Sequence, residues 1–349
     1  MAIWTYRLRR FLAEREVFIS LVILGVLMMV ADIFTELEHK TAAARTRMVG
    51  IAILLLLFIG DFLLRKYQSA FPIPLMLTDE SDRRKRRALS ASFLTATHLW
   101  KQAKVIEAAT SVRPDDLIIH FSDPDIRTSK DERLWHAAWT ELVDNWEHHL
   151  DRPLSTPFAS EGRCYHIFPH IVLPLAFALG ASVNLRRRIV LYHSQGEQFY
   201  KAVDLSRPRS LLEDTDKSVP PPKKEPKSFA GLPKAKKLIL HVFISSRHSV
   251  QFQSHADYKT AANAALRYDF DLNPDEDWLP YLQHLVSEAR SLVNKYEEVV
   301  LCLSCPAVIA FGLGMALSRN SKITVCHWLN NEYVPVFSLS NIEKNLPFD

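Results

Sequence analysis

Glycine and cysteine are scarce in this chain, which has only nine glycines and four cysteines among 349 residues. Four cysteines in a chain of this length do not suggest the disulfide framework of a small secreted domain. The sequence also lacks the G-x-x-x-x-G-K-[ST] pattern of a P-loop and the G-x-S-x-G pattern that presents a hydrolase nucleophile. These absences exclude two common kinds of hydrolytic site.

The excess of positive charge is confined to the first quarter of the chain. Residues 1–87 contain 14 Lys and Arg against 9 Asp and Glu, whereas residues 88–349 contain 29 against 30. The net charge of +4 therefore divides into +5 and −1. Because a long nucleic acid requires a broad basic surface, the nearly neutral larger part does not favour such a ligand.

Two apolar runs in the first quarter predict membrane-spanning helices at about 17–34 and 48–64. Each would be roughly 26 Å long, the short end of what a bilayer core of about 30 Å requires. A short polar connection joins them, so we expect a helical hairpin. Asp32 and Asp61 are the polar positions near the ends of these runs; an interfacial position is favoured, and a functional role within the membrane is the alternative.

Basic residues around the hairpin predict that both chain ends lie on the cytoplasmic side. Four arginines precede the first run, three basic residues lie between the runs and seven follow the second, including the block 83–87. This block would be a stop-transfer flank or a contact with anionic lipid. The alternative is a cleaved signal peptide with an A-x-A site at 42–44, but a second apolar run argues against it.

The remainder of the chain contains an internal repeat. Residues 165–206 align without gaps on residues 299–340 at an offset of 134, which pairs AFALG (176–180) with AFGLG (310–314). Upstream, LIIH (117–120) matches LILH (238–241). The repeat predicts a duplicated domain with halves at 88–206 and 237–349. The segment between them, 207–236, is rich in proline and charge and is expected to be a linker.

Each half alternates predicted strands and helices. In the first half, strands are expected at 117–121, 165–168, 188–193 and 197–204, and helices at about 130–149 and after Pro169. In the second half, strands are expected at 237–244, 299–303, 322–328 and 332–339, and helices at about 257–267, at about 278–296 and from Pro306. Alternation of this kind predicts an α/β fold of two Rossmann-like units with parallel sheets.

Ligands of open parallel sheets bind beyond the carboxyl ends of the strands, beside helix N-termini. The rule selects loops in both halves and suggests one composite pocket for a phosphorylated ligand. Arg247 would supply fixed charge, and Trp328 and Tyr333 would either stack on bases or pack at a sheet margin. The candidate ligand-binding residues are Ser122, Asp123, His170, Ser245, Ser246, Arg247, His248, Ser304, Trp328 and Tyr333.

Other chemically suggestive residues are interpreted as structural. His193 and His327 occupy matching positions in the repeat and are expected to be satisfied structural histidines. Cys302 and Cys305 form a lone C-x-x-C, which as a functional pair would be redox-active or bind metal. A second pair that would complete a zinc site is missing from the sequence. We therefore assign no catalytic residue, no metal and no cofactor.

The duplicated unit with AFALG and AFGLG resembles a SAVED domain, the fused pair of CARF-like units of CBASS anti-phage systems. In both halves the motif precedes a strand and a hairpin, VLYHSQGEQFYKAVDLS in the first and VCHWLNNEYVPVFSLS in the second. The resemblance covers about residues 100–345. With two predicted membrane helices in front, the chain resembles the transmembrane SAVED effectors.

The resemblance implies a sensor rather than an enzyme. A cyclic di- or trinucleotide second messenger would bind the SAVED domain and promote self-association, and the gathered hairpins would disrupt the lipid of the bacterial inner membrane and abort infection. This implies a multi-pass inner-membrane protein. Three alternatives stay open: a CARF-like ring nuclease that cleaves its cyclic ligand, a membrane-tethered redox protein using Cys302 and Cys305, and a scaffold that anchors a partner.

Overall fold

Two β-sheets and the helices packed on them make up the described part of the computed structural model. The described residues are 70–121, 124–155, 163–183, 185, 187–196, 198–207, 210–213, 218–229, 232, 235–246, 252–317 and 322–342. The predicted membrane helices at 17–34 and 48–64, with Asp32 and Asp61, lie outside these residues. Within the described ranges, no helix is long and apolar enough to cross a membrane.

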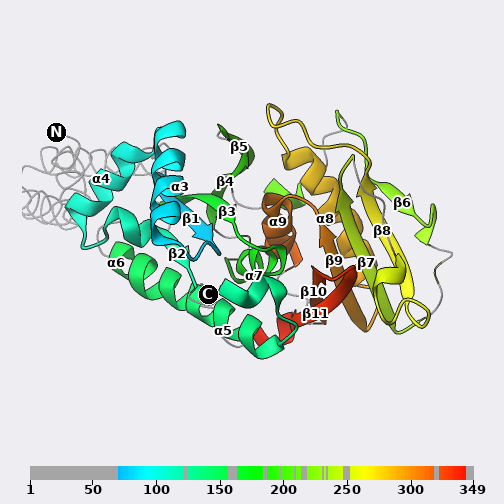
Figure 1. Cartoon of the computed structure of the whole chain (residues 1–349). Helices are drawn as coiled ribbons and strands as arrows, with labels where there is room; N and C mark the ends of the chain where they lie inside the picture. Colours follow the sequence, from blue (N-terminus) through cyan, green and yellow to red (C-terminus); the bar gives the residue numbers. More distant parts are fainter. Residues whose placement is uncertain are drawn as a thin grey trace, which may run out of the picture. The chain divides into compact units, whose positions relative to one another are not determined.

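The first sheet has the strand order β2-β1-β3-β4-β5 (Figure 1). Neighbouring strands are parallel except β5, which pairs antiparallel with β4. The strands are β1 (Phe71–Thr78), β2 (Ile118–His120), β3 (Arg163–His170), β4 (Arg188–Gln195) and β5 (Gln198–Leu205). The helices of this half are α3 (Arg83–Ala96), α4 (Trp100–Ala109), α5 (Glu132–Asp144), α6 (Arg152–Ser155) and α7 (Leu173–Val183), with short helices η1 (Pro114–Leu117), η2 (Pro124–Thr128) and η3 (Asn145–Asp151).

The second sheet has the order β11-β10-β9-β7-β8-β6, with β6 and β11 antiparallel to their neighbours. The strands are β6 (Lys223–Glu225), β7 (Lys237–Ile244), β8 (Ala262–Tyr268), β9 (Glu298–Ser304), β10 (Ile323–Leu329) and β11 (Glu332–Ser338). The helices are α8 (Leu279–Val293), α9 (Ala307–Leu317) and α10 (Leu339–Ile342), with 3-10 turns at Ser210–Leu212 and Phe252–Ser254. Apart from β6, the two sheets share one strand order, which confirms the duplication and the α/β class.

The structure corrects four expectations about the elements. The division at residue 87 is too late, because β1 lies inside the first sheet and the compact unit begins at Phe71. The upstream match equated β2 with β7, but the strand in the position of β7 is β1. The helix predicted at 257–267 is wrong, since β8 pairs there with β7. Part of the expected linker forms β6, which pairs with β8.

Helices α7 and α9 pack against each other between the two sheets (Figure 1). Their sequences, LPLAFALGASV and AVIAFGLGMAL, are almost wholly apolar, and their small residues permit close approach. A β-carbon on Gly180 would lie 2.0 Å from the carbonyl oxygen of Phe311, and one on Gly314 would lie 2.0 Å from that of Phe177. These positions are equivalent in the repeat, so the contact has the reciprocity of a two-fold interface.

A second reciprocal contact joins a strand-end histidine of each half to a tryptophan of the other. The ring centroids of His193 and Trp278 are 4.8 Å apart, and those of His327 and Trp135 are 4.9 Å apart. Each tryptophan Nε1 donates to a main-chain carbonyl, of Asn273 and Ser129 respectively. Both histidines therefore pack against the other half, as a structural role requires, and His193 also lines the cavity described below.

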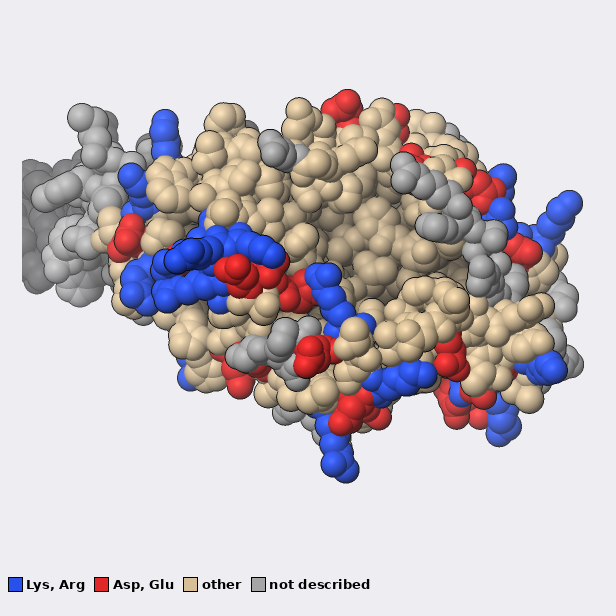
Figure 2. All heavy atoms as spheres, in the orientation of Figure 1, with Lys and Arg blue, Asp and Glu red and all other residues tan. Residues whose placement is uncertain are grey.

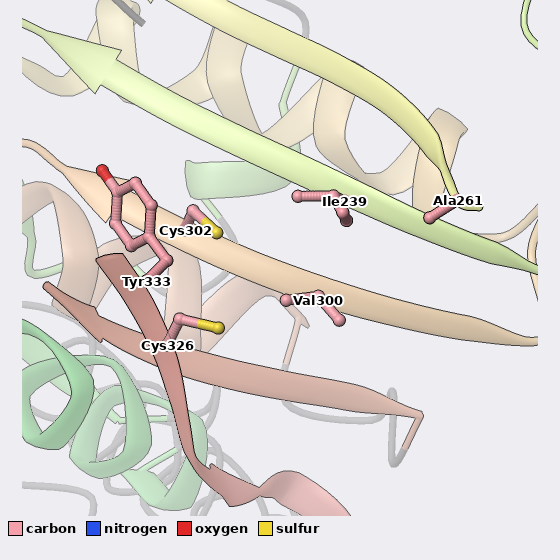
Figure 3. Packing of buried hydrophobic residues seen from close by; sticks show 6 residues of the cluster. All are labelled: Ile239, Ala261, Val300, Cys302, Cys326 and Tyr333. Carbon is pink, nitrogen blue, oxygen red and sulfur yellow. The ribbon is translucent and has the colours of Figure 1, made fainter. Parts of the chain in front are cut away.

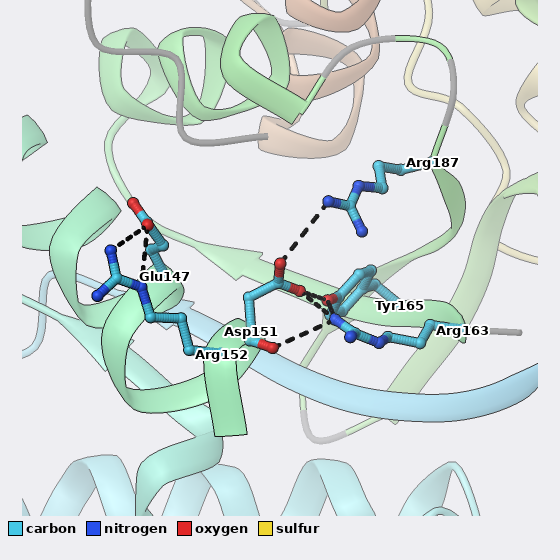
Figure 4. A network of polar contacts seen from close by, with 6 residues as sticks. All are labelled: Glu147, Asp151, Arg152, Arg163, Tyr165 and Arg187. Atoms are coloured by element: carbon cyan, nitrogen blue, oxygen red, sulfur yellow. Dashed lines mark hydrogen bonds and ion pairs between the residues drawn. The ribbon is translucent and has the colours of Figure 1, made fainter. Parts of the chain in front are cut away.

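A polar network fixes the amino end of β3. The guanidinium of Arg163, 2% exposed, pairs with Asp151, which also accepts from the hydroxyl of Tyr165 and lies 3.7 Å from Arg187 (Figure 4). Asp151 ends η3, where the backbone widens from the α-helical to the π-helical pattern. A buried charge of this kind is stable only when paired, and the network lies at the opposite end of β3 from the site described next.

Candidate ligand-binding site

A cavity of about 300 Å³ lies at the carboxyl ends of β3 and β4. It is lined by residues 168–172, residues 192–194, Arg127 and the first two residues of α9, Ala307 and Val308. The site is therefore built by both halves, with the start of α9 facing strand ends of the first half. Its size is at the lower end of the range for small-molecule pockets, and its position agrees with the strand-end rule.

Aromatic side chains form one wall of the cavity. The rings of Phe168 and His170 are stacked, with centroids 5.6 Å apart and planes inclined by 25°. From α3, Phe93 supports this wall through contacts of 5.7 Å to Phe168 and 5.4 Å to Tyr192. Burial raises the pKa of Tyr192 to about 12, so its hydroxyl is a neutral hydrogen-bonding group. Such a wall suits a flat aromatic ligand group.

Arg127 on η2 contributes a guanidinium that is fixed in place by a buried carboxylate. Its Nε and Nη2 donate to the two carboxylate oxygens of Asp79, at 2.8 and 2.7 Å. The Asp79 side chain is 1% exposed while that of Arg127 is 59% exposed. This bidentate hydrogen bond raises the pKa of Arg127. It uses Nε and Nη2, so within the described part of the chain Nη1 is left as a donor for a ligand. The arrangement presents a pre-oriented guanidinium face, which is suited to binding phosphate.

The second half also holds Arg127 in place. The Nε2 of His327 lies 2.9 Å from the main-chain oxygen of Arg127. Because a carbonyl oxygen can only accept a hydrogen bond, Nε2 must carry the proton. Nearby, Lys130 and Glu332 form an exposed ion pair at 3.5 Å across the two halves. The position of the arginine thus depends on the docking of the two halves.

Of the six described residues among the ten selected from the sequence, His170 alone lines this cavity. Ser122, Asp123, Arg247 and His248 lie outside the described residues, and their roles stay predictions. Ser245 and Ser246 follow β7; the amide and hydroxyl of Ser246 donate to Asp271 at 3.0 and 2.7 Å. Ser304 ends β9.

Trp328 and Tyr333 face each other across the β10–β11 pair. Their ring centroids are 4.7 Å apart in an edge-to-face arrangement. Tyr333 is 8% exposed and belongs to a cluster with Cys302 and Cys326 (Figure 3), whereas Trp328 is 41% exposed. Tyr333 therefore fits the packing interpretation, and Trp328 keeps a face free for stacking.

The cysteines are arranged differently from a redox C-x-x-C site. Cys302 lies in register with Cys326 on the next strand (Figure 3). Burial raises the pKa of Cys302, and it raises that of Cys305 to about 12, whereas hydrogen bonds from Cys302 and His255 lower that of Cys326. Because a reactive C-x-x-C needs an accessible thiol of low pKa, this geometry argues against redox chemistry at 302–305. The described residues contain no group of three potential metal ligands.

Sequence reasoning missed Arg127, Phe168, Tyr192 and Ser194. The strand-end rule would have reached Ser194 and its neighbours if it had also been applied to β4. Arg127 carries no local signal, because its role comes from a carboxylate 48 positions earlier. That contact forms only when η2 packs beside the end of β1.

Neither a protein-family model nor a curated protein sequence matches the chain. The chain is similar in structure to the Acinetobacter baumannii Cap4 SAVED/CARF-domain containing receptor with the cyclic trinucleotide 2'3'3'-cAAA, at 14% identity and a TM-score of 0.50, covering 86% of this chain and 59% of that one. The same receptor with 3'3'3'-cAAA matches at 15% identity and a TM-score of 0.50, covering 86% and 60%. This chain thus spans about three-fifths of those structures, with which it shares the SAVED/CARF fold.

Proposed function

We propose that this protein is a receptor for a cyclic oligonucleotide second messenger, which binds in the cavity between the two halves. The observation that carries the proposal is the pairing of a pre-oriented guanidinium with an aromatic wall. Arg127 would bind a phosphate of the ring, while the exposed ring of His170, supported from behind by Phe168, would stack on a base. Ser194 and the first amides of α9 would add hydrogen bonds.

The likeness to the Cap4 receptors supports a cyclic trinucleotide as the first ligand to test, because the matched structures hold two linkage isomers of cAAA. A ring of three nucleotides has three phosphates and three bases, so it can engage both halves of a composite pocket at once. We propose that it is bound without cleavage.

The output that we propose is membrane disruption by the N-terminal hairpin at 17–34 and 48–64. Isolated hairpins with aliphatic faces associate weakly in lipid, where close packing and polar contacts hold helices together. Self-association of ligand-bound receptors would raise the local concentration of hairpins. Asp32 and Asp61 would then come together and line a polar path at the inner membrane of a bacterium.

A panel of cyclic di- and trinucleotides tests this proposal on the full-length protein. We expect one ring to raise the melting temperature, to be recovered intact after incubation, and to release dye from vesicles that contain the protein. A variant lacking residues 17–64 should still bind but should release no dye. The absence of a thermal shift with every ring would contradict the proposed receptor function. Linear products would indicate a ring nuclease. Binding without dye release would contradict the proposed disruption of the membrane.

A further inference from the structure

A second cavity, of about 360 Å³, lies beside the edge strand β2 and holds an excess of positive charge. It is lined by Arg83, Arg86, Arg87, Arg113, Asp115, Asp116, Ile118 and His120. Four arginines and two aspartates leave a charge of +2. Figure 2 shows basic side chains gathered over α3 and β2, while the middle of that face is largely uncharged.

The arginines of this cavity differ in how far they are neutralised. Arg87 donates its Nε to Asp115 at 2.9 Å, and Arg83 approaches the same carboxylate at 3.7 Å. Arg113 lies 3.6 Å from Asp116, with 74% of its side chain exposed. The Nη1 of Arg86 donates to the main-chain oxygens of Glu80 and Ser81, at 2.9 and 2.7 Å, and these are neutral acceptors.

Arg86 therefore faces the cavity with main-chain oxygens as its hydrogen-bond acceptors rather than a carboxylate. Burial and the nearby Arg83 lower the pKa of Arg86, although Glu80 and Asp82 act in the opposite direction. Burial and Arg86 lower the pKa of His120, although Glu141 acts in the opposite direction. The Nδ1 of His120 is buried without a hydrogen-bond partner in the described part of the chain. An anion beside Arg86 would balance the charge of this guanidinium and give the Nδ1 of His120 a hydrogen-bond partner.

We propose that this cavity is a binding site for a phosphate monoester, separate from the cavity between the halves. A phosphate monoester carries about −1.5 to −2 at neutral pH, which balances the +2 of the lining residues. Guanidinium groups donate to phosphate oxygens in a matching fork geometry. A free phosphate ester and the terminal phosphate of phosphatidic acid share this chemistry, and the binding experiment separates the two sources.

Only part of the basic block 83–87 lines the proposed site. Arg83, Arg86 and Arg87 line the cavity, whereas Arg84 and Lys85 are exposed on the same helix and do not. A solvated basic flank, or basic side chains that protect an edge strand from pairing, would use all five residues alike. Arg84 is therefore the matched control for a local site.

Titration calorimetry on the full-length protein, with glycerol 3-phosphate and with dihexanoyl phosphatidic acid as probes, tests the proposal. Arg113→Gln, which leaves the fold intact because its side chain is exposed, should weaken binding at least fivefold, and Arg84→Gln should change it less than twofold. Asp115→Asn should tighten binding at least threefold, because it removes a competing carboxylate. Equal affinity for both probes indicates a free phosphate ester, and tighter binding of the lipid indicates a headgroup.

Three results would overturn the proposal: no binding of either probe at millimolar concentration, equal weakening by Arg84→Gln and Arg113→Gln, or weaker binding in Asp115→Asn. Arg86→Gln is a second probe of the site, and its thermal melt shows whether the loop after β1 has been disturbed. The response to cyclic oligonucleotides does not enter this test, so the two proposals fail independently.

Discussion

Gly180 lies directly against the main-chain carbonyl of Phe311, where a β-carbon would come within 2.0 Å of the oxygen. The equivalent pair, Gly314 and Phe177, makes the same contact in the other direction. The two halves are thus held by helices that touch backbone to backbone. Since Arg127 and α9 meet at the cavity only when the halves are docked, this contact supports the candidate site.

Gly314→Ala should destabilise the protein strongly, because the added methyl group meets backbone atoms of α7 that cannot rotate away. We expect a loss of about 1–3 kcal/mol or more in the free energy of unfolding. Gly312→Ala is the matched control on the same helix, since its β-carbon meets the flexible end of the Leu282 side chain. Denaturant unfolding that shows a larger loss for Gly312→Ala would contradict the proposed interface.

Arg127→Gln should abolish measurable binding of the cyclic oligonucleotide and also lower the melting temperature, because it leaves the buried Asp79 carboxylate without its partner. Adding Asp79→Asn should restore much of the stability but none of the binding. This double variant separates a role in the fold from a role in the site. Lys130→Gln, which removes only an exposed ion pair, should bind like the unaltered protein. Recovery of affinity in the double variant would remove Arg127 from the site.

Stability should fall on acidification because of two histidines, the buried His241 and the partly buried His166. Burial lowers the pKa of His166 and of His241 to about 4 each, against about 6.5 in an unfolded chain. Between these values the unfolded state binds more protons, so the free energy of unfolding decreases as pH falls from 6.5 to 4, by up to about 3 kcal/mol for each group. His241→Gln should reduce the difference between pH 7 and pH 4.5. An unchanged difference in this variant and in His166→Gln would contradict the assignment.

Cys302→Ser with Cys305→Ser should leave ligand binding and vesicle leakage within about twofold of the unaltered protein. The reason is that burial raises the pKa of both thiols, so neither is poised as a redox nucleophile. Both activities are measured under reducing and oxidising conditions. A response that depends on redox conditions in the unaltered protein and is lost in the double variant would favour the redox alternative.

The repeat predicted the elements at 165–206 and 299–340 closely, because the strands and the small-residue helix in these two segments align without gaps. Strand β7 has the predicted bounds, and β9 to β11 differ from theirs by about one residue. Strand β1 was not predicted, and it contains Pro72 and Pro74, which are unfavourable in the interior of a sheet. The structure explains their presence: β2 pairs only with Met76–Thr78, so both prolines lie where β1 has β3 as its one described neighbour.

Two other differences have tertiary causes. Residues 257–267 are rich in alanine, a strong helix former, yet pairing with β7 on one side and β6 on the other makes β8 a strand. The strand-end rule selected the carboxyl ends of the parallel strands, and the cavity lined by His170 lies at the ends of β3 and β4. Arg127 was not predicted, because its contact with Asp79 joins residues far apart in sequence.

The central claim is that one chain binds one cyclic oligonucleotide between its two halves. Titration calorimetry of the full-length protein, with the ring that gives the largest thermal shift, tests it most directly. The account predicts saturable binding with one ring per chain, lost in Arg127→Gln and kept in Lys130→Gln. Two rings per chain, or equal affinity in the Arg127→Gln variant, would contradict it.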